Sequence, residues 1–125
     1  MTRRTQWVIT LMKSDLGRSS SLSHIARSVN LSPSRLRHVF KAETGITPTQ
    51  YLQMLRMELA KQLLETTVLT VKEIAFMTGI ACDSYLVREF KKTYGVSPAR
   101  YREYYQSNLR MTESAIEVIA KSTNE

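Results

Sequence analysis

At 125 residues the chain is short for two ordinary domains, and its 42% hydrophobic residues can bury a core as two small lobes. The single cysteine excludes an intrachain disulfide and a cysteine-based structural zinc site, and no apolar run approaches the ~18 residues of a membrane-spanning helix. The net charge of +7 is concentrated before residue 111, and such a basic body fits a polyanionic partner, either nucleic acid or an anionic membrane surface.

The N-terminal segment predicts a short helix rather than a signal peptide. A helix is expected over residues 5–13 because apolar residues recur on one helical face: Trp7, Val8, Leu11 and Met12. Polar residues interrupt this apolar patch, and no small-residue cleavage site follows it. Residues 15–21 are rich in Gly and Ser and predict a loop.

Two short helices separated by a tight turn are predicted next. Ser21 is a suitable N-cap for the first helix, whose apolar stripe falls at helical spacing: Leu22, Ile25, Ala26 and Val29. Asn30 tolerates the left-handed conformation that ends a helix, and Leu31 can fill the turn. The Ser32-Pro33 pair then starts a second helix, which Gly45 ends.

The longest uninterrupted helical pattern runs from Pro48, capped by Thr47, to about Glu65. Its apolar positions are Tyr51, Leu52, Leu55, Leu59, Leu63 and Leu64. At 1.5 Å per residue this helix is about 27 Å long. That length is close to the roughly 34 Å between successive major grooves on one face of DNA.

A second pair of short helices follows the long helix. Thr70 and Glu73 form the T-x-x-E pattern of a capping box, and Gly79 ends the first helix of this pair. The second helix begins around Cys82 or Asp83 and ends at Gly95. A last helix starts after it with a further Ser-Pro cap and contains Tyr101, Tyr104 and Tyr105.

The two pairs are copies of each other. Ile25-Ala26 corresponds to Ile74-Ala75 at a spacing of 49 residues. A spacing of 50 relates Phe40-Lys41, Gly45, Pro48 and Tyr51 to Phe90-Lys91, Gly95, Pro98 and Tyr101. The second copy therefore has one extra residue between Ala75 and Phe90, most simply in its turn.

The repeat predicts an all-α chain in four parts. A first helix-turn-helix lobe spans residues 1–46, a linker helix 47–66, a second lobe 67–106 and an acidic tail 107–125. The last 15 residues hold one Lys and three Glu. Within the tail, one short amphipathic helix is expected to contain Ala115, Ile116, Ile119 and Ala120.

The second helix of each pair has a polar, largely cationic outer face. In the first copy this face consists of Ser34, Arg35, Arg37, His38 and Lys41, and in the second of Asp83, Ser84, Val87, Arg88, Lys91 and Lys92. A tight turn that fixes the crossing angle allows such a helix to enter a major groove. Cations then hold phosphates, and Arg can pair with guanine O6 and N7. A merely solvated charged face is the alternative.

The second face is chemically different from the first, because it also contains an acidic and an apolar residue. Asp83 can accept a hydrogen bond from cytosine N4, and Val87 can touch a thymine methyl group. Asp83 can equally be an N-terminal helix charge that complements the helix dipole.

Other reactive side chains favour structural roles. Cys82 has no partner thiol and neither His is near it in sequence, so a buried or half-buried structural cysteine is expected rather than a nucleophile. His24 and His38 lack the spacing of a metal pair, and the three C-terminal tyrosines fit helix packing better than base stacking. We therefore predict no catalytic residue, metal, cofactor or small-molecule site.

The chain resembles the DNA-binding domain of AraC/XylS-type transcriptional regulators. The segments that carry the resemblance are Gly79-Ile80, 84–92 and 94–102 in the second copy, and Ile25-Ala26, 31–33, 39–41, Thr44-Gly45 and Pro48 to Tyr51 in the first. The match covers about residues 5–102.

This resemblance implies seven helices, with two helix-turn-helix lobes joined by the long helix and both recognition helices in successive major grooves. Base-contacting positions of the family correspond to Ser34, Arg37 and His38, and to Asp83, Ser84, Val87 and Arg88. Phosphate contacts would come from Lys41, Lys91, Lys92 and the helix N-termini near Ser21 and Thr70. Many members carry a separate effector or dimerisation domain before this unit, so the chain is either a short stand-alone regulator or the C-terminal part of a longer one.

The function expected is sequence-specific binding of double-stranded DNA in the cytoplasm, at the nucleoid, to regulate transcription. The family suggests activation through RNA polymerase more often than repression. A second hypothesis is a protein-interaction module that contacts RNA polymerase or a partner regulator. A third, enzymatic hypothesis is transfer of an alkyl group to Cys82.

Overall fold

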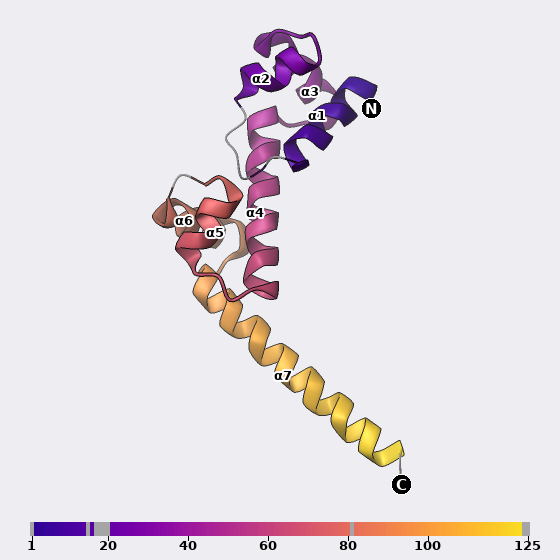
Figure 1. Cartoon of the computed structure of the whole chain (residues 1–125), viewed down its shortest axis with the longest axis vertical. Helices are drawn as coiled ribbons and strands as arrows, with labels where there is room; N and C mark the ends of the chain where they lie inside the picture. The colour runs from indigo at the N-terminus through magenta and orange to yellow at the C-terminus, as the bar shows by residue number, and fades with distance from the viewer. Residues whose placement is uncertain (1, 15, 17–20, 81, 124–125) are drawn as a thin grey trace.

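The computed structural model describes residues 2–14, 16, 21–80 and 82–123. Over these residues the chain consists of helices and connecting turns (Figure 1). The helices are α1 (Arg3–Ser14), α2 (Leu22–Ser28), α3 (Pro33–Thr44), α4 (Pro48–Thr66), α5 (Val71–Thr78), α6 (Asp83–Tyr94) and α7 (Pro98–Thr123). The predicted all-α fold, with two helix-turn-helix lobes joined by a long helix, is confirmed. None of the described helices is both long and apolar enough to cross a membrane.

Two separate hydrophobic cores share α4. The first core lies among α1, α2 and α3 and includes Val8, Ile25 and Phe40, while the second lies among α5, α6 and the start of α7. Leu55 of α4 belongs to the first core and Met57 to the second. Two positions apart on a helix are about 200° apart around its axis, so α4 changes the face that it buries halfway along its length.

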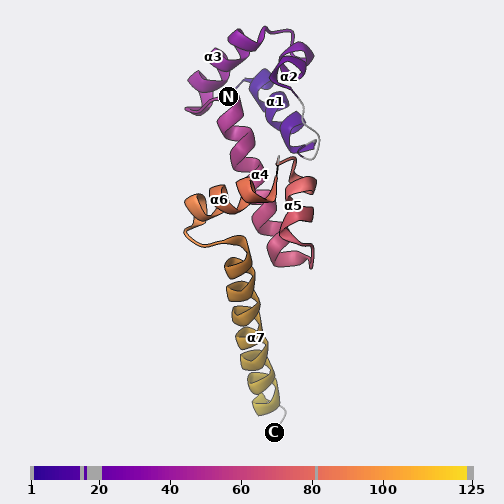
Figure 2. The same ribbon diagram turned by 90° about the vertical axis from the view of Figure 1, so that its left-hand side faces the viewer.

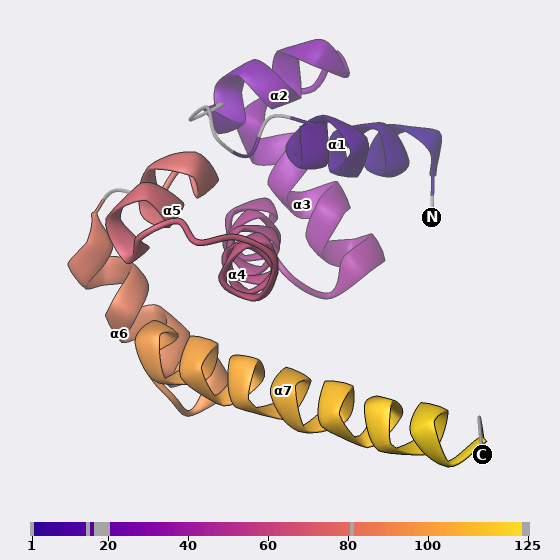
Figure 3. The same cartoon turned by 60° about the horizontal axis from the view of Figure 1, so that its bottom comes forward.

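This change of face explains why the sequence pattern in α4 was only partly right. Leu59 fits a single apolar stripe but is only half-buried, whereas Met57 and Ala60 are buried in the second core. A helix that packs against one core has one apolar stripe, but a helix between two cores needs two. Figure 3 views α4 nearly end-on and shows α1 to α3 and α5 to α6 in different directions around it.

Local capping signals start most helices where they were predicted. The hydroxyls of Ser21 and Ser32 accept hydrogen bonds from backbone N–H groups in the first turns of α2 and α3. In the capping box of α5, Thr70 Oγ1 accepts from the backbone N–H of Glu73, and Glu73 Oε1 accepts from the backbone N–H of Thr70. These hydrogen bonds with Thr70 lower the pKa of Glu73.

The repeat seen in the sequence is also a repeat in structure. The N–H of Leu31 donates to the carbonyl of Ala26, and the N–H of Ile80 donates to that of Ala75, both at 2.9 Å. These pairs are 49 residues apart, whereas the N-caps of α3 and α6, Ser32 and Cys82, are 50 apart. The extra residue of the second copy therefore lies between Ile80 and Cys82 in the chain, at position 81, which is outside the described residues.

The C-terminal helix differs from the expectation of a separate short helix in the tail. α7 runs without a break over 26 residues from Pro98 to Thr123. Side chains from Gln106 to Lys121 are exposed, and this part of α7 extends away from both lobes (Figures 1 and 2). Periodicity did find an amphipathic pattern here, but it did not reveal that the pattern continues the preceding helix.

Candidate nucleic-acid interface

The outer face of α3 presents all five side chains that were predicted to contact DNA. Ser34, Arg35, Arg37, His38 and Lys41 are exposed, while Leu36 and Phe40 on the opposite face are buried. An open hollow of about 510 Å³ lies on this face, lined by Ser34, Arg37, His38, Lys41, Ala42 and Thr47. Three donors, Arg37, His38 and Lys41, therefore surround one concave surface.

Two sets of contacts hold α3 in place below this face. The carboxylate of Glu43 accepts hydrogen bonds from the backbone N–H of Thr2 at 3.1 Å and from the hydroxyls of Thr2 and Thr5. The ring of Phe40 packs edge-on against Tyr51 of α4, with ring centroids 5.4 Å apart. α3 is thus tied to α1 at its C-terminal end and to α4 through the first core.

The outer face of α6 is exposed too, but its side chains have more internal contacts. Asp83, Ser84, Val87, Arg88, Lys91 and Lys92 are all exposed, and Val87 is 38% exposed. The guanidinium carbon of Arg88 lies 5.4 Å from the centroid of the Tyr85 ring, and its Nε is 3.8 Å from Oε1 of Glu89. Lys91 and Lys92 occupy the last turn, so two exposed cations of this face lie at its C-terminal end.

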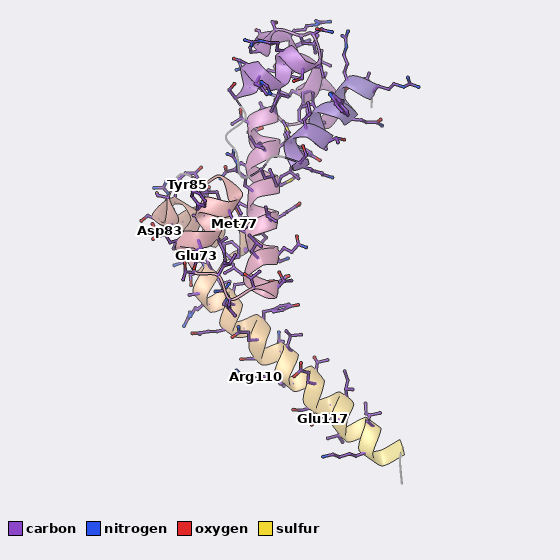
Figure 4. All side chains as sticks on the ribbon, viewed as in Figure 1. Glu73, Met77, Asp83, Tyr85, Arg110 and Glu117 are labelled. Atoms are coloured by element: carbon purple, nitrogen blue, oxygen red, sulfur yellow. The ribbon has the colours of Figure 1, made fainter. Side chains whose placement is uncertain are left out.

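Asp83 has a structural role at the start of α6. The N-cap residue Cys82 makes no side-chain capping hydrogen bond, and Oδ1 of Asp83 accepts from the backbone N–H of Ser84 at 3.0 Å. Its carboxylate also lies in the first turn, where a negative charge complements the helix dipole. Of the two interpretations that the sequence left open, helix stabilisation has direct support. Figure 4 labels Asp83 and Tyr85 near the start of α6.

Two contacts tie α6 to the rest of the molecule. The Tyr85 hydroxyl receives a hydrogen bond of 3.3 Å from the side-chain amide of Gln53 on α4. The Phe90 ring contacts Tyr101 of α7 at a centroid distance of 5.7 Å, which repeats the Phe40–Tyr51 contact of the first lobe. Both recognition helices are therefore braced by the same aromatic pair, one copy per lobe.

The two outer helices share a side of α4 in one view only, since the end-on view of Figure 3 shows them in different directions around it. In Figure 2, α3 and α6 are to the left of α4, whereas α2 and α5 are to its right.

One expectation about the remaining candidate residues was wrong. Cys82 was expected to be buried or half-buried, but it is exposed. It is the N-cap residue of α6, and this position at the start of the helix places its side chain outside the second core. His24 and His38 are exposed, and no cluster of three or more His, Cys, Asp or Glu side chains occurs in the part of the chain that the structure describes. Among the tyrosines, Tyr101 packs against Phe90, whereas Tyr104 is 73% exposed.

Sequence patterns did not find the residues that position the interface. Glu43, Gln53 and Tyr85 hold the recognition helices through partners at least 32 residues away in the chain. Tyr85 belongs to the segment 84–92 that carries the family resemblance, but no local pattern predicted the hydrogen bond that its hydroxyl accepts from Gln53. Ala42 and Thr47 complete the hollow on α3 only because the turn at Gly45 folds α4 back beside it.

A family model described as a helix-turn-helix domain matches residues 25–104, which include both outer helices. The chain belongs to the AraC/XylS-type helix-turn-helix family. Among its curated relatives is the Msm operon regulatory protein of Streptococcus mutans, with 31% identity over 98 residues, covering 78% of this chain and 35% of the relative. This AraC/XylS-type chain thus spans about a third of that relative's length.

Two solved structures extend the comparison. The C-terminal domain of the two-component response regulator yesN from Fusobacterium nucleatum has a TM-score of 0.76 and 32% identity, covering 81% of this chain and 99% of that one. The DNA-binding domain of AdpA, a global transcriptional factor solved in complex with a target DNA, has a TM-score of 0.80 and 27% identity, covering 86% and 96%. The chain therefore carries an AraC/XylS-type DNA-binding domain of a transcription regulator.

Proposed function

We propose that one chain binds an asymmetric double-stranded DNA site, with α3 and α6 in successive major grooves, and that this binding activates transcription initiation. The exposed cationic face of α3, with its hollow, is the observation that carries the proposal. α4, which separates the two lobes, has 19 residues and is about 28 Å long, comparable with the roughly 34 Å between grooves.

The two faces divide the work of binding. Arg37 and His38 line the hollow of α3 together with Ser34, and a forked guanidinium can recognise guanine through O6 and N7. On α6, Arg88 already contacts the Tyr85 ring, and Asp83 accepts a hydrogen bond in the first turn of the helix. Lys91 and Lys92 in the last turn then bind phosphates. Ser84, Val87 and Arg88 complete the second contact surface, and Arg35 and Lys41 complete the first.

Selection of bound sequences from random double-stranded DNA tests this function. We expect the protein to enrich one asymmetric site with two half-sites about 10 base pairs apart, one helical turn of DNA. Arg37→Ala should relax the preference at one position, because a bidentate contact to guanine is worth about 1–3 kcal/mol. Arg110→Ala is the matched control, since Arg110 lies on the part of α7 that leads away from both lobes (Figure 4). Absence of any enriched sequence, together with unchanged affinity of Arg37→Ala at low salt, would overturn the proposal.

A second candidate function has its own support on the outer face of α5. Phe76 is 82% exposed and Met77 50% exposed, and both line an open hollow of about 350 Å³ with Leu69, Lys72 and Glu73. Val68, just before α5, is 93% exposed. Contiguous exposed apolar side chains of this kind mark protein contacts, and RNA polymerase or a partner regulator is the partner that we propose for them.

Phe76→Ser separates this contact from DNA binding. We expect unchanged affinity for the selected DNA but reduced transcription in a reaction reconstituted with purified RNA polymerase. Val87→Ser, a matched apolar-to-polar change on the recognition helix α6, should alter DNA binding instead. If Phe76→Ser leaves transcription unchanged, the proposal that this surface contacts RNA polymerase is wrong.

We place this activity in the cytoplasm, at the nucleoid, and include no catalytic step in it. The family membership supports regulation by binding rather than by chemistry. Intact mass of the protein after exposure to alkylated DNA tests the point, because an alkyl group on the exposed Cys82 would add mass.

A further inference from the structure

The two turns of the repeat use different residues for the same backbone conformation. Asn30 in the first turn has φ 59°, and Gly79 in the second has φ 76°, so both adopt the left-handed conformation. Each is followed by the residue whose N–H donates back to the preceding helix, Leu31 or Ile80. Because Asn serves this conformation in the first lobe, the backbone angle alone does not explain a glycine in the second.

Close approach of another backbone segment explains the glycine. A Cβ atom built on Gly79 would overlap the backbone carbonyl oxygen of Leu16, which lies between α1 and α2 of the first lobe. The left-handed glycines Gly45 and Gly95 have nothing within 4 Å of such a Cβ. Gly79 is thus the point where the α5–α6 turn of one lobe meets the backbone of the other.

Side chains of α4 fill the same junction. A Cβ on Gly79 would lie 3.4 Å from Nε and 3.5 Å from Nη2 of Arg56. Nε of Arg56 is buried and has no hydrogen-bond partner within the described residues. One turn earlier on α4, Gln53 donates to the Tyr85 hydroxyl of α6. Part of the Arg56 guanidinium is therefore buried at this junction without an acceptor for its Nε N–H, which costs free energy.

We propose that Gly79 is a positioning residue that lets the first lobe close against the α5–α6 turn and so sets the separation of the two recognition helices. α4 sets the distance along its axis, and the face that it buries in each core sets the direction of each lobe. The contact between Gly79 and Leu16 adds a second point of attachment beside α4. With two points, the lobes cannot rotate freely about α4, and the protein accepts DNA half-sites at one spacing. This inference deepens the proposed function and rests on it.

Electron paramagnetic resonance can test the junction without DNA. Spin labels are attached at Ala42→Cys on α3 and Thr93→Cys on α6, two exposed positions, in a Cys82→Ser background. We expect a single narrow distance distribution for this parent protein. Gly79→Asn should broaden or shift the distribution, because Asn tolerates the backbone angle but adds the Cβ that meets Leu16.

Gly95→Asn is the matched control. It places the same side chain at the same left-handed conformation, where nothing lies within 4 Å, so the distribution should stay as in the parent protein. Equal effects of the two variants would overturn the inference, since the effect would then come from backbone strain. If Gly79→Asn fails to fold, the parent protein decides: a narrow distribution supports a fixed junction and a broad one overturns it.

Measurements of DNA affinity test the role of Gly79 independently of the label distances. On the selected site, Gly79→Asn should lose roughly tenfold in affinity, because two linked contacts gain affinity only when geometry permits both at once. Its affinity for an isolated half-site should be unchanged, and sites with altered half-site spacing should be discriminated less. If selection with the parent protein enriches no sequence, the proposed function fails, while the label distances still decide the role of Gly79.

Discussion

At the scale of single residues, the two recognition faces are chemically unequal. Arg37 and His38 of α3 line an open hollow, whereas Arg88 of α6 lies over the Tyr85 ring and Asp83 accepts a hydrogen bond in the first turn of its own helix. A side chain that already has a partner must give it up to read a base, which reduces the net gain in free energy. We therefore assign most base reading to α3 and most phosphate binding to α6.

Lys91→Ala tests this assignment. Affinity should fall by a similar factor for preferred and random DNA, and the slope of log affinity against log salt should become less steep by about 1, because one phosphate contact is lost. Titrations over a series of salt concentrations measure the slope. Lys121→Ala, an exposed lysine on the α7 extension, should leave it unchanged. A change in sequence preference with Lys91→Ala would mean that the two helices have the opposite roles.

At the scale of elements, α7 closes the second lobe through one arginine. The guanidinium of Arg102 donates to the backbone carbonyls of Leu64, Thr67 and Leu69, at 3.1, 3.2 and 2.6 Å. These carbonyls lie at the C-terminal end of α4 and in the segment leading to α5, where a helix leaves acceptors unpaired. Arg102 therefore joins α7 to the end of α4 and to the segment before α5, which a lysine with a single ammonium group cannot do equally well.

Arg102→Ala should lower the free energy of unfolding by about 2–3 kcal/mol, because partly buried carbonyls would lose a charged donor. Urea denaturation followed by circular dichroism measures this loss. Arg100→Ala, an exposed arginine in the same helix, is expected to change stability by less than about 0.5 kcal/mol. Equal stability of the two variants would show that the three carbonyls are satisfied by water.

A second contact between α4 and α7, from the Tyr101 hydroxyl to the Glu65 carboxylate, predicts that the stability of the fold depends on pH. Burial, followed by the neighbouring carboxylate of Glu65, raises the pKa of Tyr101 from 10.0 to about 12. Since the folded pKa is above the unfolded value, the neutral phenol stabilises the fold fully below pH 10. This stabilisation is lost as the pH rises through the window between 10.0 and about 12.

Glu65→Gln should lower the pKa of Tyr101, because it removes a negative charge that the Tyr101 hydroxyl contacts at 3.2 Å. Absorbance of tyrosinate during an alkaline titration measures this shift, with Tyr101→Phe identifying the signal of this residue. A signal that titrates identically with Glu65 and with Gln would contradict the contribution of the carboxylate.

At the scale of the whole molecule, stability should come from the two lobes and not from the α7 extension. Every described side chain from Gln106 to Lys121 is exposed, whereas Tyr101 and Arg102 contact the second lobe. The division of the chain at about residue 106 remains a prediction, which shortening of α7 examines directly.

A chain ending at Gln106 should unfold within about 2 °C of the full chain, since it loses no buried side chain. A chain ending at Ala99 is the comparison, and it should lose the cooperative unfolding of the second lobe because Tyr101 and Arg102 are removed. Differential scanning calorimetry measures both. A large loss of stability in the first truncation would mean that the extension packs on the lobes in solution.

Most of the fold could be predicted because its signals are local. Caps at Ser21, Ser32 and Thr70 act on backbone groups three residues away, and apolar stripes repeat every three or four positions. The faces of α3 and α6 followed from the same periodicity. The buried positions Met57 and Ala60 escaped because they depend on which core α4 faces at that point, and that is not a property of α4 alone.

Local sequence signals were enough to predict the helices, the repeat with its extra residue between Ala75 and Phe90, and the side chains exposed on α3 and α6. The contacts between these parts became apparent only in the folded chain: the contact of Arg88 with Tyr85, the exposure of Cys82, the three carbonyls bound by Arg102 and the approach of Leu16 to Gly79. The reason is the separation in sequence between the residues that interact. Helices form through hydrogen bonds between residues three or four apart, whereas Leu16 and Gly79 meet only after both lobes have packed on α4.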